Sequence, residues 1–123
     1  MTPSLGIVLF AHGSRDPQWH RPMLAVAEQI RQSDPRVAVQ CAYLELTPPT
    51  LHEAVESLAS QGVREIRVVP MFLGVGKHAR EDLPQLLAAL HQSHPELSIA
   101  CQPAVGEQSA VIELLARIAL EKI

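Results

Sequence analysis

Two histidines and a glutamate each follow a short apolar run of the chain, and all three are of types that bind metal ions. They are His12, Glu45 and His78. Imidazole and carboxylate ligands suit divalent iron, cobalt, nickel and zinc, and three protein ligands leave positions open for an incoming group. A neutral imidazole also accepts protons near neutral pH. We therefore expect one site that holds a divalent metal and takes up protons, if the fold brings these residues together.

Four apolar runs alternate with four segments whose apolar residues recur at helical spacing. The runs predict buried strands over residues 5–11, 37–44, 65–71 and 97–101. Helices are predicted from Pro17 to about residue 33, from Thr50 to Gly62, over about 80–91 with Pro84 in the first turn, and around 112–120. The box Thr50-Leu51-His52-Glu53 is a specific signal for the start of the second helix. Four βα units predict an α/β fold with an open parallel sheet, order 2-1-3-4, and helices on both faces.

That topology decides where the metal-binding residues should lie. Parallel strands end at one edge of the sheet, and ligands of such sheets bind beyond that edge, where the winding reverses between the first and third strands. Neighbouring strands are about 4.8 Å apart, so residues leaving three adjacent strands can converge. Taken singly, His12 is also explained as a turn histidine, and Glu45 as a solvated loop residue or helix cap. Their common edge favours a shared site.

Basic residues flank the two histidine loops. Arg15, Lys77 and Arg80 give a locally positive rim to a chain whose formal charge is −3. With Ser14, they are candidate binding residues for a polycarboxylate, although solvated surface charge explains each one taken alone. The remaining helical histidines, His52, His91 and His94, are expected on the solvated surface, where His91 and His94 have the spacing of a same-face pair. Trp19 and His20 are expected to pack under the first loop.

Length and composition bound the class of protein. A chain of 123 residues fits one domain, residues 1–123, and its 47% apolar but only 3% aromatic content suits parallel strands covered by helices. The absence of a basic stripe argues against nucleic acid. No signal peptide and no membrane-spanning run is visible, so we expect a cytoplasmic protein without a membrane partner. The two cysteines, Cys41 and Cys101, lie inside strand-like runs and are expected to pack as reduced thiols.

Several short motifs, in their order and spacing, resemble the class II chelatases, specifically their short single-domain form that acts on sirohydrochlorin. The matching segments are residues 12–17 (HGSRDP), 43–45 (YLE), 48–49 (PP), 70–73 (PMFL), 76–78 (GKH) and 82–84 (DLP). The resemblance implies a flavodoxin-like half-domain in which His12 and His78 bind the metal beside the tetrapyrrole and Glu45 assists. It implies insertion of Co2+, Fe2+ or Ni2+ in cobalamin, sirohaem or nickel-tetrapyrrole synthesis, with no cofactor beyond the substrate metal. Because longer relatives carry two such halves, it also implies a homodimer.

Other functions fit the residues less well. A histidine phosphatase needs an arginine before the nucleophilic histidine, and Ala11 stands there. A signalling receiver needs an acidic cluster after the first strand, and the glycine pattern is neither a Walker loop nor a dinucleotide fingerprint. A non-catalytic module that binds metal or tetrapyrrole uses the same ligands and stays open at this point.

Overall fold

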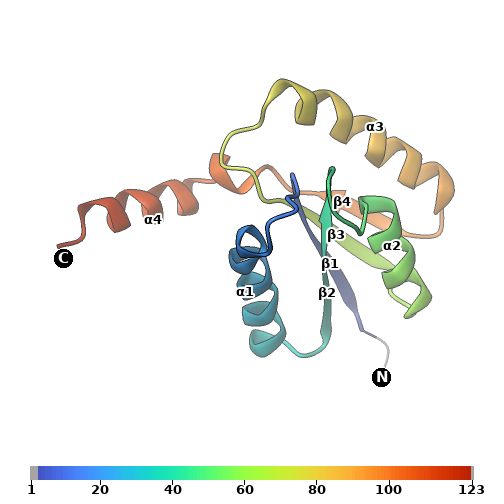
Figure 1. Ribbon diagram of the computed structural model, residues 1–123. Coiled ribbons are helices and arrows are strands. Elements are labelled where there is room, and N and C mark those ends of the chain that lie inside the picture. The colour runs from blue at the N-terminus through green and yellow to red at the C-terminus, as the bar shows by residue number, and fades with distance from the viewer. Residues whose placement is uncertain (1–2, 123) are drawn as a thin grey trace.

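Four parallel strands form the sheet of the computed structural model, which describes residues 3–122 (Figure 1). The strands are β1 (Leu5–Ala11), β2 (Val37–Tyr43), β3 (Glu65–Pro70) and β4 (Ser98–Cys101). Their order is β2-β1-β3-β4, so the predicted α/β class, strand order and parallel sense are confirmed. The register pairs Ala11 with Tyr43 and Phe10 with Pro70. The ends of β2, β1 and β3 consequently lie side by side at one edge of the sheet.

Three helices cover the two faces of the sheet (Figure 1). The helix α1 (Pro17–Ser33) packs on one face, and α2 (Leu51–Ser60) and α3 (Lys77–Ser93) pack on the other. Asp16 caps α1 by accepting the backbone N–H of Gln18. The predicted capping box of α2 is present, because Thr50 and Glu53 each accept the other's backbone N–H. The Thr50 backbone N–H, and to a smaller extent the Thr50 side chain, lower the pKa of the Glu53 carboxyl group, because a hydrogen bond to the carboxylate favours its ionised form.

The predicted start of the third helix was wrong. Helix α3 begins at Lys77 and not near residue 80, so Lys77 and His78 occupy its first turn and are not loop residues. Its N-cap is Gly76, which has no side chain to accept a backbone N–H, so the polar cap that marks many helix starts is missing. Pro84 consequently lies inside the helix and not in the first turn.

The core has two layers, one on each face of the sheet. On one face, Val8 and Phe10 of β1 pack with the buried leucines of α2 and α3. On the other, Leu9 and Ala11 pack with Met23 and Ala27 of α1. The alternation follows from the pleat of the strand, which points successive side chains to opposite faces. Both cysteines are free, half-buried and packed against these layers, and burial raises the pKa of each thiol.

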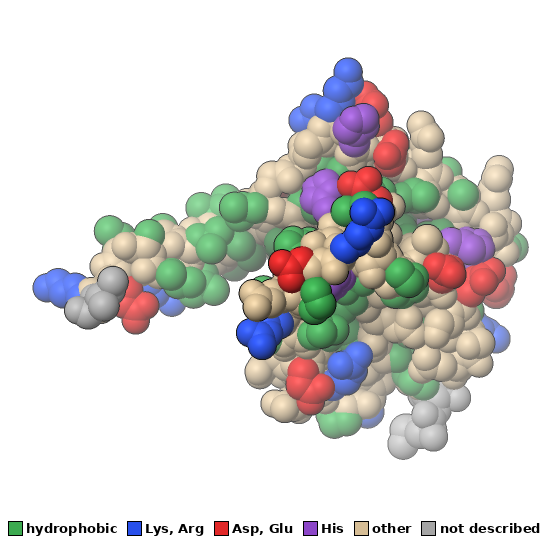
Figure 2. Space-filling view, in the orientation of Figure 1, with side chains coloured by type: hydrophobic (Ala, Val, Ile, Leu, Met, Phe, Trp, Pro, Cys, Tyr) green, Lys and Arg blue, Asp and Glu red, His purple; other side chains and the backbone are tan. Residues whose placement is uncertain are grey.

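The last helix, α4 (Ser109–Leu120), does not cover the sheet. It follows a short 3-10 turn, η1 (Val105–Glu107), and projects from the body of the protein (Figure 1). None of its residues is buried, and Ile112, Leu115 and Ile118 are 53%, 43% and 56% exposed. Figure 2 shows this arm with hydrophobic side chains along much of its visible surface. No helix within residues 3–122 has the length and apolar character needed to cross a membrane.

Candidate functional site

His12 and Glu45 are held next to each other by backbone pairing beyond the ends of β1 and β2. The Glu45 N–H donates to the His12 carbonyl oxygen at 3.0 Å, continuing the ladder from the Leu44 N–H to the Ala11 carbonyl at 2.9 Å. Gly13 makes this approach possible. Its φ of +103° lies in the left-handed region, and a Cβ atom at this position would overlap the Glu45 carbonyl oxygen. The turn after β1 therefore requires glycine and fixes the spacing between the two loops.

The imidazole of His12 lies on an aromatic ring. Its centroid is 4.6 Å from that of Phe72, with 47° between the planes, and Phe72 in turn packs edge-on against Phe10. Phe72 is buried whereas His12 is exposed. An apolar support restrains the imidazole plane without occupying a ring nitrogen. His12 can therefore present a nitrogen to solvent or to a ligand.

His78 enters the same edge from the start of α3. It is exposed, as are Lys77 and Arg80 on the same helical turn. Because no side chain caps this helix, its first backbone N–H groups point outward without an internal acceptor. The amide groups and the two cations together make this corner attractive to a carboxylate.

Ser14 and Arg15 lie at the start of α1, on the other side of His12. The Ser14 Oγ accepts the Asp16 N–H at 3.0 Å, and the Ser14 carbonyl accepts Nε2–H of His20 at 2.7 Å. Ser14 and Arg15 also border an open hollow of about 550 Å³ whose other lining residues include Tyr43 and Thr47. The predicted binding residues thus fall into two groups, Ser14 with Arg15 and Lys77 with Arg80.

An aromatic cluster supports the first of these groups. His20 packs edge-on against Tyr43 at 4.9 Å and against Trp19 at 5.0 Å, and it bonds the Ser14 carbonyl of the first loop, whereas Trp19 beside it is 38% exposed. Burial raises the pKa of Tyr43 to about 12, with smaller contributions from the neighbouring Cys41 thiol. Tyr43 therefore stays a neutral phenol at any physiological pH.

The structure places His12, Glu45 and His78 at one edge without closing them into a cage. Among residues 3–122, the group of three metal-ligating side chains with ligand atoms within 4.8 Å of one another lies elsewhere, at His52, Glu56 and His94. Figure 2 shows histidine, basic and acidic side chains gathered over the strand ends. An open arrangement of this kind suits a metal that arrives and leaves, since structural metal sites are closed by protein ligands on all sides.

Sequence reasoning missed two residues that shape this edge. Phe72 supports His12 from the loop after β3, and Gly13 permits the contact with Glu45. Both lie inside motifs noted in the sequence, but neither carries a polar group, so a search for chemistry passes over them. The only sequence signal was the glycine directly after a strand-ending histidine.

The fold is that of a class II chelatase. The CbiX family model matches residues 6–122, and the chain belongs to that family. It is 36% identical over 88 residues to the sirohydrochlorin cobaltochelatase of Methanosarcina barkeri, covering 72% of this chain and 68% of that protein. The enzyme of the same name from Saccharolobus solfataricus is 39% identical over 83 residues, covering 68% and 63% of the two chains.

Solved structures give the same picture. A cobalamin biosynthesis CbiX protein from Marinobacter aquaeolei matches with a TM-score of 0.79 and 31% identity, over 94% of this chain and 91% of its own. The sirohydrochlorin chelatase SirB of Bacillus subtilis, in complex with cobalt, matches with a TM-score of 0.77 and 26% identity. The match covers 94% of this chain but only 50% of SirB, so this chain spans about half the length of that chelatase.

Proposed function

We propose that this protein inserts a divalent metal ion into sirohydrochlorin. The observation that carries the proposal is the placement of His12, Glu45 and His78 around one open edge in a chain of the CbiX family. The relatives from M. barkeri and S. solfataricus are both sirohydrochlorin cobaltochelatases, which names the tetrapyrrole and favours cobalt. Fe2+ and Ni2+ share the same ligand preferences, so ferrochelatase activity and a sirohaem or nickel-tetrapyrrole pathway are the alternatives to cobalamin synthesis.

The reaction needs a metal ligand and a proton acceptor. As M2+ enters the macrocycle, two pyrrole N–H bonds break and four nitrogen–metal bonds form, so two protons leave and charge balances. His12 and His78 hold the ion through imidazole nitrogens and accept the departing protons. Glu45, paired to His12 through the backbone, supplies a carboxylate that offsets the positive charge of the ion. No cofactor beyond the substrate metal enters this scheme.

Two groups of residues suit the rim of the substrate. Sirohydrochlorin carries carboxylates around its macrocycle, and Lys77, Arg80 and the uncapped start of α3 attract them on one side. Arg15 and the Ser14 hydroxyl serve the other side, beside the open hollow. The flat macrocycle then spans from α1 to α3, above His12.

An anaerobic insertion assay tests the proposal. Sirohydrochlorin is mixed with Co2+, Fe2+ or Ni2+, with and without protein, and the visible spectrum is followed for the metallated product. We expect the protein to accelerate insertion of Co2+ most. Tight binding of the tetrapyrrole or the ion without faster insertion would identify a non-catalytic binding module and would refute the proposed metal-insertion activity.

We further propose that the working form is a homodimer in which α4 of each copy packs on the sheet of the other copy. The helix is apolar around most of its circumference, and such helices are normally buried. Each copy also has an uncovered surface on which the α4 of the other copy can pack. By strand alternation, Ser98 and Ala100 of β4 point to the face carrying α1, and both are exposed. Two copies also match the length of SirB, of which one copy covers 50%.

The cytoplasmic location stays a prediction.

A further inference from the structure

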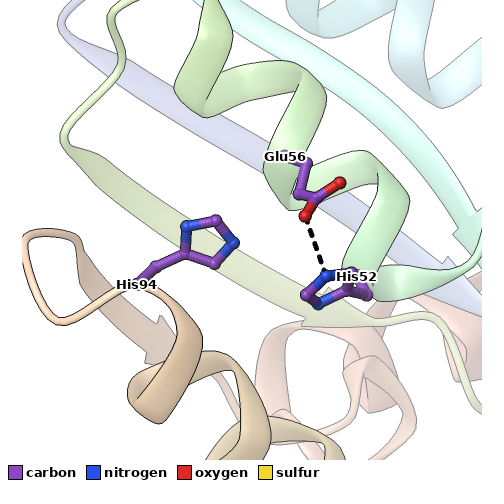
Figure 3. Close-up of side chains that lie close together, drawn as sticks. All are labelled: His52, Glu56 and His94. Atoms are coloured by element: carbon purple, nitrogen blue, oxygen red, sulfur yellow. Dashed lines mark ion pairs between the residues drawn. The ribbon is translucent and has the colours of Figure 1, made fainter.

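A second group of metal-ligating side chains lies on the helical face away from α1. His52 is in the first turn of α2, Glu56 follows one turn later, and His94 caps the end of α3 (Figure 3). One ligand atom from each residue lies within 4.8 Å of those of the other two. The sequence predicts these histidines on the solvated surface, with His94 on the same helical face as His91. The fold instead brings His94 to His52, because α2 and α3 meet here.

The contacts within this group leave one nitrogen without a partner. His52 Nε2 lies 2.9 Å from Glu56 Oε1, and the His52 and His94 rings are 5.7 Å apart between centroids. His94 Nε2 is buried and has no hydrogen-bond partner among the described residues. Figure 3 shows a ring nitrogen of His94 pointing towards the other two side chains. A buried polar atom in this state is unfavourable unless something else binds it.

The other nitrogen of His94 lies near a carboxylate. His94 Nδ1 lies 3.5 Å from Glu96 Oε1. A proton on Nδ1 directed at that carboxylate leaves the Nε2 lone pair free, which is the usual arrangement of a metal-bound histidine with a carboxylate behind it. An ion pair between His52 and Glu56, four residues apart on α2, accounts for those two side chains but leaves His94 Nε2 unexplained.

We propose that His52, Glu56 and His94 bind one borderline divalent cation, Zn2+, Co2+ or Ni2+. Two imidazoles and a carboxylate form a common three-ligand zinc set with water in the fourth position. With bonds of about 2.1 Å, tetrahedral ligand atoms lie roughly 3.4 Å apart, and the three ligand atoms already lie within 4.8 Å of one another, so only a small rearrangement is needed. The His52 and Glu56 side chains are 47% and 56% exposed and can rotate inward towards the more buried His94. The ion would join the start of α2 to the end of α3.

Metal binding to a chain lacking the first site tests the proposal. In the variant His12→Ala/His78→Ala, prepared metal-free, equilibrium dialysis against Co2+ or Zn2+ should give about one bound ion per chain, with a raised Tm. Adding His94→Gln or His52→Gln should weaken binding at least tenfold and remove the rise in Tm. His91→Gln, which replaces an exposed histidine of α3, should change neither.

A second arm uses the otherwise unchanged chain, in case the double variant folds poorly. There, His94→Gln should lower the metal stoichiometry by about one ion while tetrapyrrole-dependent insertion persists. Metal binding that is the same with and without His52 and His94, in either background, would overturn the site. Failure of insertion alone would count against the proposed function and leave this site standing, because its readout is binding of the ion by itself.

Discussion

His12 rests on a ring that cannot form a bond with it. Phe72 lies against the imidazole at 4.6 Å, fixes its tilt, and offers neither a hydrogen-bond donor nor a carboxylate. In many metal sites a polar neighbour assigns one ring nitrogen to a structural hydrogen bond. An aromatic support leaves that assignment open, so the same histidine can hold a metal at one stage and a proton at another.

The first prediction concerns the two site histidines. His12→Ala and His78→Ala should each lower kcat/KM for metal insertion by at least about 100-fold, the scale of a lost proton acceptor. Both side chains are exposed, so the circular dichroism spectrum and Tm should stay close to those of the unchanged protein. His91→Ala, an exposed histidine further along α3, is the matched control and should keep full activity. Unchanged rates in both site variants would show that insertion occurs elsewhere.

A second prediction uses Tyr43, the only tyrosine of the chain. Because burial raises its pKa to about 12, the ultraviolet absorbance of tyrosinate should rise with a midpoint well above the ordinary value near 10. Below pH 10 the phenol is protonated in both the folded and the unfolded protein. Above it, the unfolded chain ionises first, so stability falls as the pH rises from about 10 to 12. A midpoint near 10 in the folded protein would contradict the buried environment.

Residue types alone indicated the polar candidates at this edge but not the residues that support them. Histidine and glutamate stand out because their side chains can bind metal and because three of them follow neighbouring strands. Phe72 and Gly13 look like ordinary core and turn residues. Their importance depends on contacts between the segments that follow β1, β2 and β3, which cannot be read from the sequence. For the same reason His52 and His94 could not be paired, since the meeting of α2 with α3 is a property of packing.

At the scale of elements, the loop that leads to His78 is held from a distant part of the chain. The Gly106 N–H in η1 donates to the Phe72 carbonyl at 3.0 Å, and a Cβ atom on Gly106 would overlap the Leu73 carbonyl oxygen. The segment that follows β4 therefore packs directly on the segment that carries Phe72 and leads into α3. Any widening of this contact moves the support of His12 and the start of α3 together.

The third prediction tests that contact with two alanine substitutions. Gly106→Ala should destabilise the fold by about 1–3 kcal/mol, the usual cost of overpacking, and should lower the insertion rate although it is not a site residue. The matched control is Gly74→Ala. Gly74 lies in the loop between β3 and α3 that Gly106 contacts, and a new Cβ atom there has nothing within 4 Å. Urea unfolding and the insertion assay measure the two effects. Equal behaviour of the two variants would show that η1 does not position the loop.

The elements that sequence predicted best are those with local signals. Continuous apolar runs located the four strands to within a residue or so, and the capping box located α2. The start of helix α3 was predicted too late because Gly76 has no side chain that would mark the helix N-terminus. The direction in which α3 crosses the sheet also cannot be read from its local sequence. The helical pattern of α4 was also clear, but where it packs depends on surfaces beyond its own residues.

At the scale of the whole molecule, α4 is the feature that the single chain leaves unexplained. Its apolar residues stay exposed while part of the α1 face of the sheet stays uncovered. If two copies exchange α4, each helix buries its apolar residues against the uncovered sheet face of the other copy. Stable complexes bury about 1,200–2,000 Å² in total, and two such contacts would contribute to that area.

The fourth prediction is that charge on α4 separates the copies. In light scattering coupled to size exclusion, the unchanged chain should run as a dimer and Leu115→Glu/Ile118→Glu as a monomer. Two glutamates placed at Ala88 and Ala89, exposed residues of α3, should leave the dimer intact. A monomer at micromolar concentration with α4 unchanged would rule out the exchange.

The cluster beneath the first loop also gives the protein a built-in optical reporter. Trp19 is the only tryptophan in the chain, is 38% exposed, and lies against His20 and near Tyr43, two residues that line the hollow next to Ser14. Its fluorescence therefore comes from one place, with no signal from elsewhere to subtract. Because tetrapyrroles absorb where tryptophan emits, docking of the macrocycle at this edge should quench that emission by energy transfer. The arrival of the organic substrate can thus be followed separately from the arrival of the metal, in real time and without any label.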